Sequence, residues 1–279
     1  MDILTQEKFY NTTIDTIGAI SKLPIVRVDR DEFLRKQFKD SPYLEDILRY
    51  GPQKVYSMES ISKKAKKIVN SNTTNTALIS FATGIPSNPL VMFPAGGADI
   101  AQYFGFSIHM AQQIAYLFGE DNLFHSDSNE LSEEAKIRVI AYLGVMLGAS
   151  GSASLIANIS KTAGNNLGKK IANQALTKTT WYPLVKKVAA IIGQKITKKT
   201  VEKTITKVIP IIGGVISGGI TYAVFKPMGN RLIKTFVMNE SGEYKEDMEL
   251  NKEYKGGVNS SDINIIEGEF TEINTKDFS

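Results

Sequence analysis

The 279-residue chain contains no cysteine and only two histidines. Without thiols it can form no disulfide, and it has no thiolate to act as a nucleophile or a metal ligand. The sequence also lacks a Walker A motif, a dinucleotide-binding glycine fingerprint, a nucleophile elbow and a kinase signature. These absences exclude most nucleophilic and nucleotide-dependent mechanisms. We therefore expect no catalytic residue, no metal site and no cofactor.

Strand-like alternation of apolar and polar residues is scarce before residue 240, whereas helix signals are frequent. Asp29 begins a capping box, and Ser57 and Ser132 are placed to cap two further helices. Ser41-Pro42 predicts another helix start, and Gly51-Pro52 predicts the end of that helix. The fold class that follows is all-α, a multi-helix bundle with glycine-rich hydrophobic helices.

Two long stretches, Val139–Ser160 and Val208–Phe225, carry no charge. We expect the first to continue the helix that starts after Ser132, and the second to end at Lys226-Pro227. Glycine inside a helix costs about 1 kcal/mol relative to alanine, and close packing against another helix is the usual compensation. Small residues spaced by four are typical of such packing. We predict helix contacts at Gly144, Gly148, Gly213, Gly214 and Gly218.

Charge is segregated along the chain. Residues 240–279 contain 11 acidic and 4 basic residues, a net charge of −7, which leaves residues 1–239 with a net charge of +11. We divide the chain into an N-terminal helical segment (1–52), a helical core (53–239) and a mobile, disordered acidic tail (240–279). A strongly basic body favours a polyanionic partner. The tail has three open roles: a disordered segment, a shield for the basic surface, or a binding segment for a partner.

The clearest basic pattern is a lysine stripe that recurs every four residues. It consists of Lys195, Lys199, Lys203 and Lys207, with Lys198 beside them. A basic amphipathic helix can lie on anionic lipid, and we predict that this stripe contacts an anionic membrane surface. A merely solvated lysine face remains the alternative. Nucleic acid is disfavoured as a partner because arginine and interleaved aromatic side chains are scarce there.

A polar stripe runs along the apolar helix expected at residues 95–119. Asp99, Gln102, His109 and Gln113 fall on one helical face. Such groups could form a proton relay, a polar pocket or a hydrogen-bond network with neighbouring helices. Asp99 and His109 are about 15 Å apart along the axis, so they cannot bond directly. We expect Asp99 to stabilise the helix start and His109 to be a neutral hydrogen-bonding residue between helices.

Three segments resemble the EcsC family of bacterial proteins. They are the run Pro94–Asp99, the helix end Ala115–Gly119, and Ile209–Gly219 with Phe225 and Gly229 after it. The resemblance covers roughly residues 50 to 238. It implies an all-helical protein linked to the membrane and to secretion, and it transfers no catalytic residue to this chain.

The first residues are acidic and polar, unlike a signal peptide, so we expect a cytoplasmic protein at the inner face of the cell membrane. The function that we predict is that of a non-catalytic, membrane-associated accessory protein in export or envelope homeostasis, with a membrane protein as a further partner. Two alternatives stay open. One is a membrane-inserting effector of the toxin or defence type. The other is an enzyme that acts on a lipid-like substrate through the Asp99 and His109 face.

Overall fold

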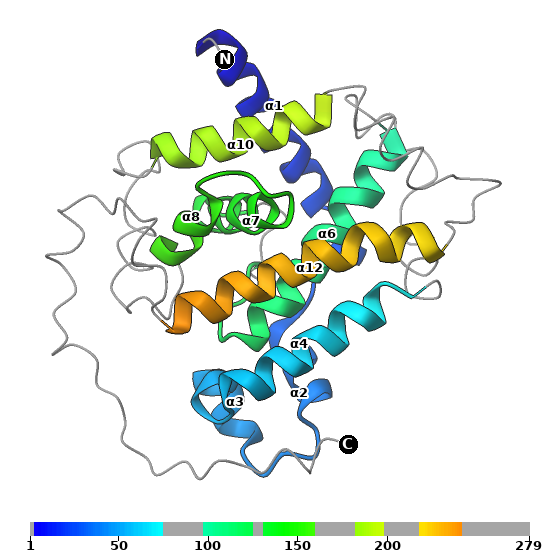
Figure 1. Ribbon diagram of the computed structural model, residues 1–279, viewed down its shortest axis with the longest axis vertical. Helices are drawn as coiled ribbons and strands as arrows, with labels where there is room; N and C mark the ends of the chain where they lie inside the picture. Colours follow the sequence, from blue (N-terminus) through cyan, green and yellow to red (C-terminus); the bar gives the residue numbers. More distant parts are fainter. Residues whose placement is uncertain (1–2, 75–96, 125–130, 160–181, 198–217, 242–279) are drawn as a thin grey trace, which may run out of the picture.

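The computed structural model describes residues 3–74, 97–124, 131–159, 182–197 and 218–241 (Figure 1). All regular structure in these ranges is helical, which confirms the predicted all-α fold. The elements are α1 (Ile3–Ser21), η1 (Pro24–Val26), α2 (Arg30–Gln37), α3 (Leu44–Tyr50), η2 (Pro52–Lys54), α4 (Met58–Asn72), α6 (Gly97–Leu117), α7 (Glu133–Met146), α8 (Ser152–Ile159), α10 (Tyr182–Thr197) and α12 (Gly218–Ser241).

Helix α6 is the centre of the bundle. It contacts α1, η1, α2, α4, α7 and α12, and Figure 1 shows these elements arranged around it. Phe104, Ile108, Ile114 and Leu117 are each at most 1% exposed although they point in different directions around the helix. A helix with buried side chains in several directions must be surrounded by other elements. This requirement explains why the strongly apolar stretch lies in the middle of the fold.

Local capping chemistry sets several helix starts as the sequence predicts. The side chains of Asp29, Ser57 and Ser132 accept hydrogen bonds from the backbone N–H groups three residues further on. The start predicted at Ser41-Pro42 is wrong, since α3 begins at Leu44. Ser41 instead accepts hydrogen bonds from the Tyr43 backbone N–H and from the Tyr56 hydroxyl, so its side chain joins two segments.

The uncharged stretch 139–160 is not one helix. Helix α7 ends at Met146 and α8 starts at Ser152, and the turn between them contains Gly148 and Gly151 at φ +72° and +86°. Only glycine adopts such angles without strain. Most apolar side chains of both helices are buried in the common core. In the described part of the chain, no helix combines the length and apolar character needed to cross a bilayer.

Helix α12 also differs from its prediction, because it continues through Pro227 instead of ending there. Proline has no N–H to donate to the carbonyl four residues earlier, which costs about 3 kcal/mol in a helix interior. Phe225 and Met228 are buried on either side of it, followed by Leu232 and Phe236 one and two turns later. Burial of each such side chain is worth about 1.5–3 kcal/mol, so tertiary packing outweighs the proline.

Helices α1 and α10 pack against each other although they come from distant parts of the chain. The buried Thr13 hydroxyl donates to the Ala189 carbonyl at 2.7 Å. One hydrophobic core contains residues on both sides of position 52, among them Ile17, Ile47 and Leu143. The described residues of segment 1–52 therefore share a core with the predicted central region. The acidic tail lies outside the described residues, apart from its first two positions.

Candidate functional site

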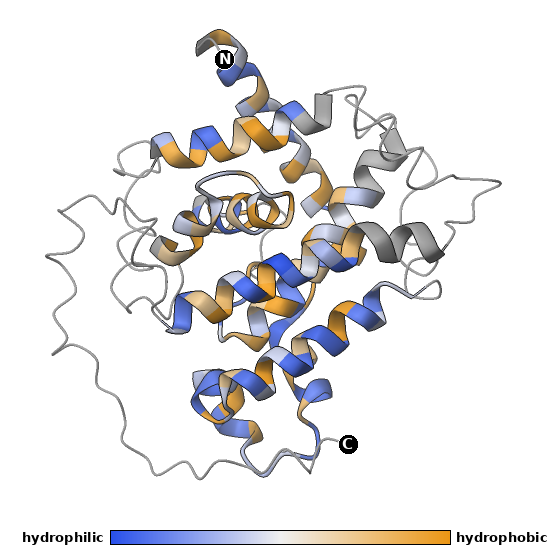
Figure 2. Ribbon diagram, in the orientation of Figure 1, coloured by the Kyte–Doolittle hydropathy of each residue, from blue (hydrophilic) through white to orange (hydrophobic). Residues whose placement is uncertain are grey.

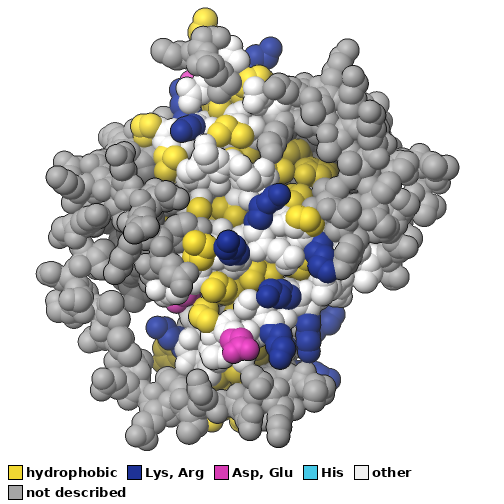
Figure 3. All heavy atoms as spheres, viewed as in Figure 1, with side chains coloured by type: hydrophobic (Ala, Val, Ile, Leu, Met, Phe, Trp, Pro, Cys, Tyr) yellow, Lys and Arg dark blue, Asp and Glu magenta, His cyan; other side chains and the backbone are white. Residues whose placement is uncertain are grey.

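The surface of interest is a basic face formed by α4 and α12, which we call the α4–α12 face. Its cations are Lys63, Lys64, Lys66 and Lys67 on α4 and Lys226, Arg231 and Lys234 on α12. Lys64 and Lys226 are partly buried, and the other five are exposed. Figure 3 shows Lys and Arg side chains gathered over these two helices.

Apolar periodicity explains why these cations share a surface. On α4, Ile61, Ala65 and Val69 recur every four residues and are buried, which turns the lysines between them outward. Helix α12 approaches closely at Gly229, where an added Cβ would lie 2.6 Å from a methyl group of Val69. Figure 2 shows hydrophilic and hydrophobic residues alternating along α4 and the described part of α12.

Acidic residues lie at one end of this face. Helices α4 and α12 run antiparallel (Figure 1), so Glu59 in the first turn of α4 and Glu240 in the last turn of α12 lie toward the same end.

The Arg231 guanidinium donates to the Met146 carbonyl at 2.8 Å, which ties α12 to the C-terminal end of α7. A cation is favourable there because helix carbonyls carry partial negative charge.

The predicted lysine stripe is largely outside the described residues. Lys195 lies near the end of α10, where the structure describes the backbone but not the side chain, and Lys198, Lys199, Lys203 and Lys207 fall in an undescribed range. Sequence reasoning missed the α4–α12 face as a site, because its two halves are more than 150 residues apart. The four α4 lysines were visible in the sequence, but their α12 neighbours were not.

The predicted glycine contacts have separate outcomes. An added Cβ on Gly144 would meet the Val188 and Ser152 side chains at 2.6 and 2.7 Å, so α7 lies close to α8 and α10 there. Gly148 has nothing within 4 Å of that position, and its glycine is needed for the turn after α7. Gly218 is the first residue of α12, while Gly213 and Gly214 lie outside the described residues.

Part of the predicted polar stripe is brought together between α4, α6 and η1. The Asn72 amide donates to Gln113 Oε1 at 2.5 Å, and the Gln113 amide lies 3.1 Å from His109 Nε2. His109 Nδ1 lies 3.0 Å from the Ile25 carbonyl. A neutral imidazole with its hydrogen on Nδ1 satisfies both contacts. The side chains of the other stripe members, Asp99 and Gln102, are not described.

Gln112, the residue before Gln113, was not singled out from the sequence. Its fully buried amide donates to the Val26 carbonyl at 2.8 Å and accepts from the Val28 N–H at 3.1 Å. Gln112 and His109 thus tie η1 and the segment after it to α6. Both side chains use their polar atoms to join elements of the fold, which indicates a structural role for His109 and Gln112.

Burial lowers the pKa of His109 below its ordinary value of 6.5, against the opposing effect of the Ile25 hydrogen bond. Below about pH 6.5 the unfolded chain takes up a proton that the folded chain still excludes. The free energy of unfolding therefore decreases as the pH is lowered. We expect a His109→Gln variant to lose less stability than the wild type between about pH 7 and pH 5. Urea denaturation at several pH values measures this difference. Parallel pH profiles would show that folding does not suppress protonation of His109.

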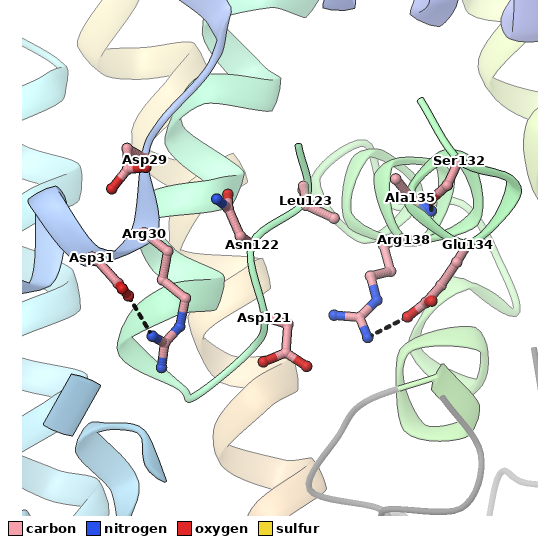
Figure 4. A pocket seen from close by; sticks show the side chains of 10 residues that line it. All are labelled: Asp29, Arg30, Asp31, Asp121, Asn122, Leu123, Ser132, Glu134, Ala135 and Arg138. Atoms are coloured by element: carbon pink, nitrogen blue, oxygen red, sulfur yellow. Dashed lines mark hydrogen bonds and ion pairs between the residues drawn. The ribbon is translucent and has the colours of Figure 1, made fainter. Parts of the chain in front are cut away.

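A polar pocket of about 400 Å³ lies beyond the C-terminal end of α6 (Figure 4). Its residues come from the start of α2, from the loop after α6 and from α7. They are Asp29, Arg30, Asp31, Asp121, Asn122, Leu123, Ser132, Glu134, Ala135 and Arg138. In Figure 4 the two guanidinium groups extend from opposite walls, each bonded to a carboxylate of the pocket. Sequence reasoning missed this pocket, because its walls are far apart along the chain.

Behind the pocket, Glu120 joins the two arginines. Arg138 Nη1 donates to Glu120 Oε2 at 2.9 Å, and Arg30 Nε donates to the Glu120 carbonyl at 3.1 Å. The Tyr142 hydroxyl also donates to Glu120 Oε2. Burial works against the charge of Arg138, but Glu120, Tyr142 and Glu134 outweigh it and raise the pKa of this guanidinium. Both arginines are thus committed to contacts within the protein.

The described residues contain no group of three or more His, Cys, Asp and Glu side chains placed to hold a metal ion. The polar pocket offers paired charges, and the His109 cluster offers a neutral imidazole bonded on both sides. The α4–α12 face differs from both, because its cations outnumber its acids and most of them reach solvent. Its chemistry suits the recognition of an extended anion.

No protein family, curated protein or solved structure that we compared with this chain matches it. The EcsC resemblance therefore stays a prediction from the sequence.

Proposed function

We propose that this protein is a non-catalytic helical accessory protein that associates with the anionic inner face of the cell membrane. The observation that supports the proposal is the α4–α12 face, with seven cations and two acids on two adjacent helices. Each Lys or Arg near an anionic membrane contributes about 1 kcal/mol. Five exposed cations acting together give an attraction of about 5 kcal/mol before the costs of association. Binding of this size is reversible and weakens as salt increases.

Lipid fits this face better than nucleic acid does. Six of its seven cations are lysines, and the one arginine, Arg231, is bonded to the Met146 carbonyl. Base recognition relies on arginine forks and on aromatic platforms. Lysine ammonium groups act as point charges, which suits a fluid array of headgroups. The roles in export or envelope homeostasis, and a membrane-protein partner, rest on the EcsC resemblance.

Charge reversal on this face tests the proposal. We expect the triple variant Lys66→Glu, Lys67→Glu and Lys234→Glu to bind vesicles of phosphatidylcholine and phosphatidylserine about 100-fold more weakly at low salt. The loss of three favourable charges costs about 3 kcal/mol, and the new carboxylates add repulsion. Vesicle co-sedimentation measures binding, and circular dichroism confirms that the helices persist.

The matched control reverses three exposed lysines on or beside other helices, Lys8, Lys22 and Lys36. It changes the net charge equally, so we expect only a small loss of binding. Equal losses in the two variants would mean that total charge matters and the α4–α12 face does not. A wild-type protein that ignores anionic vesicles at low salt would refute the proposed function itself.

A further inference from the structure

A recess of about 110 Å³ opens beside the α4 half of the basic face, next to the end of α2. Phe38 and Tyr56 line it, and their rings stack with centroids 5.4 Å apart. Lys63, Lys64 and Lys67 surround these rings. Lys63 and Lys67 are exposed on the α4–α12 face, so the recess and the face share two of their cations.

The recess concentrates positive charge. Three ammonium groups line it, and none of the described residues that line it is acidic. Like charges three or four positions apart on a helix destabilise it, and Lys67 has this spacing to both Lys63 and Lys64. Glu59 lies one turn before Lys63 but does not line the recess.

Lys64 is the most constrained of the three lysines. Its ammonium lies over the Phe38 ring, 4.6 Å from the ring centroid, and the side chain is only partly exposed. Burial and then the charge of Lys67 lower the pKa of Lys64. Contact with the ring offsets part of the cost of burying this charge. An anion bound between these lysines would offset the repulsion between Lys64 and Lys67.

We propose that this recess binds the phosphate monoester headgroup of an anionic lipid, with the phosphate held by Lys63, Lys64 and Lys67. A phosphate monoester carries a charge of about −1.5 to −2 and three strong acceptor oxygens, which match three ammonium donors. The buried Phe38 and Tyr56 rings form part of the recess wall behind these lysines. A soluble phosphate monoester has the same head chemistry. Lipid is the source we infer, since Lys63 and Lys67 also belong to the surface proposed to face the membrane.

This inference rests on the proposed membrane association and adds selectivity to it. Phosphatidylserine supplies a phosphodiester and a carboxylate, whereas phosphatidic acid supplies a monoester. We expect the wild type to bind phosphatidylcholine vesicles containing phosphatidic acid about tenfold more tightly than vesicles containing phosphatidylserine at equal surface potential. A charge-assisted hydrogen bond that only the monoester makes is enough for a difference of this size.

Two double variants with equal charge loss locate the selectivity. Lys64→Gln with Lys67→Gln changes the recess, and Lys66→Gln with Lys234→Gln changes the face outside it. We expect the recess variant to lose the tenfold preference for phosphatidic acid. The control should keep that preference while binding both vesicles more weakly. Thermal unfolding of each variant shows whether the fold is intact.

The outcomes separate this inference from the proposed function. Wild-type binding that is equal for the two lipids, or a preference that survives in the recess variant, overturns the headgroup site and leaves membrane association standing. A lack of binding to either anionic vesicle overturns both. Glycerol 3-phosphate, a soluble phosphate monoester, tests the source of the anion. If it binds the recess in solution and the protein shows no preference for phosphatidic acid vesicles, the ligand is a soluble monoester and the lipid assignment is wrong.

Discussion

Replacement of Arg138 by methionine is expected to lower the free energy of unfolding by about 3–5 kcal/mol. The Arg138 and Glu120 side chains are 6% and 1% exposed, so the ion pair between them is shielded from water. Without the guanidinium, the Glu120 carboxylate stays buried and loses its hydrogen bond from Arg138. Its hydrogen bond from the Tyr142 hydroxyl is kept. A buried charge without its counter-ion costs far more than the intact pair contributes. Urea denaturation followed by circular dichroism measures the loss.

Two further variants test this explanation. Glu134→Gln removes the more exposed partner of Arg138, which is 27% exposed, and should cost no more than about 1 kcal/mol. The double variant Arg138→Met with Glu120→Met removes both buried charges and should recover much of the stability lost by the single change. If the double variant is less stable than Arg138→Met alone, the penalty does not come from an uncompensated carboxylate.

A Gly193→Ala substitution is expected to destabilise the protein by about 1–3 kcal/mol, although alanine is the better helix former. An added Cβ would run into the backbone carbonyl of Phe9 on α1, with the Thr13 hydroxyl 2.8 Å away. Backbone atoms cannot rotate aside as a flexible side chain can, so α1 would have to shift. Thermal or urea unfolding of the purified variant measures the effect.

Gly18→Ala is the matched control on α1, since nothing lies within 4 Å of its added Cβ. Here the same chemical change should stabilise the protein by about 0.4–1 kcal/mol, because it restricts the unfolded chain. The two substitutions should therefore act with opposite signs. If Gly193→Ala is tolerated as well as Gly18→Ala, α1 and α10 do not pack as closely as the structure indicates.

Features set by neighbouring residues were predictable from the sequence. The caps at Asp29, Ser57 and Ser132 depend on contacts over three residues, and all three were predicted correctly. Helix ends that depend on tertiary packing were not predictable in this way. Pro227 fails to end α12 because buried side chains on both sides of it hold the helix together.

The candidate surfaces could not be predicted from the sequence either, because they are formed by residues that only the folded chain brings together. Glu120 and Arg138 are 18 residues apart, and no helical or strand spacing predicts that they pair. The α4 lysines resemble any solvated helix face until Val69 and Gly229 bring α12 beside them. His109 is the intermediate case. Its place on a polar stripe was visible in the sequence, but its partner Ile25 depends on how the chain folds back over α6.

The pairing of α1 with α10 also affects how the protein is made. The hydrogen bond from Thr13 to Ala189 joins residues that are 176 positions apart. At roughly 5–20 residues per second, synthesis leaves α1 without its partner for roughly 10–35 s. During that time the apolar side of α1 is exposed on the nascent chain, where it can be bound by a chaperone or associate with another chain. Closure of the bundle therefore depends on a contact that forms only after α10 has been synthesised.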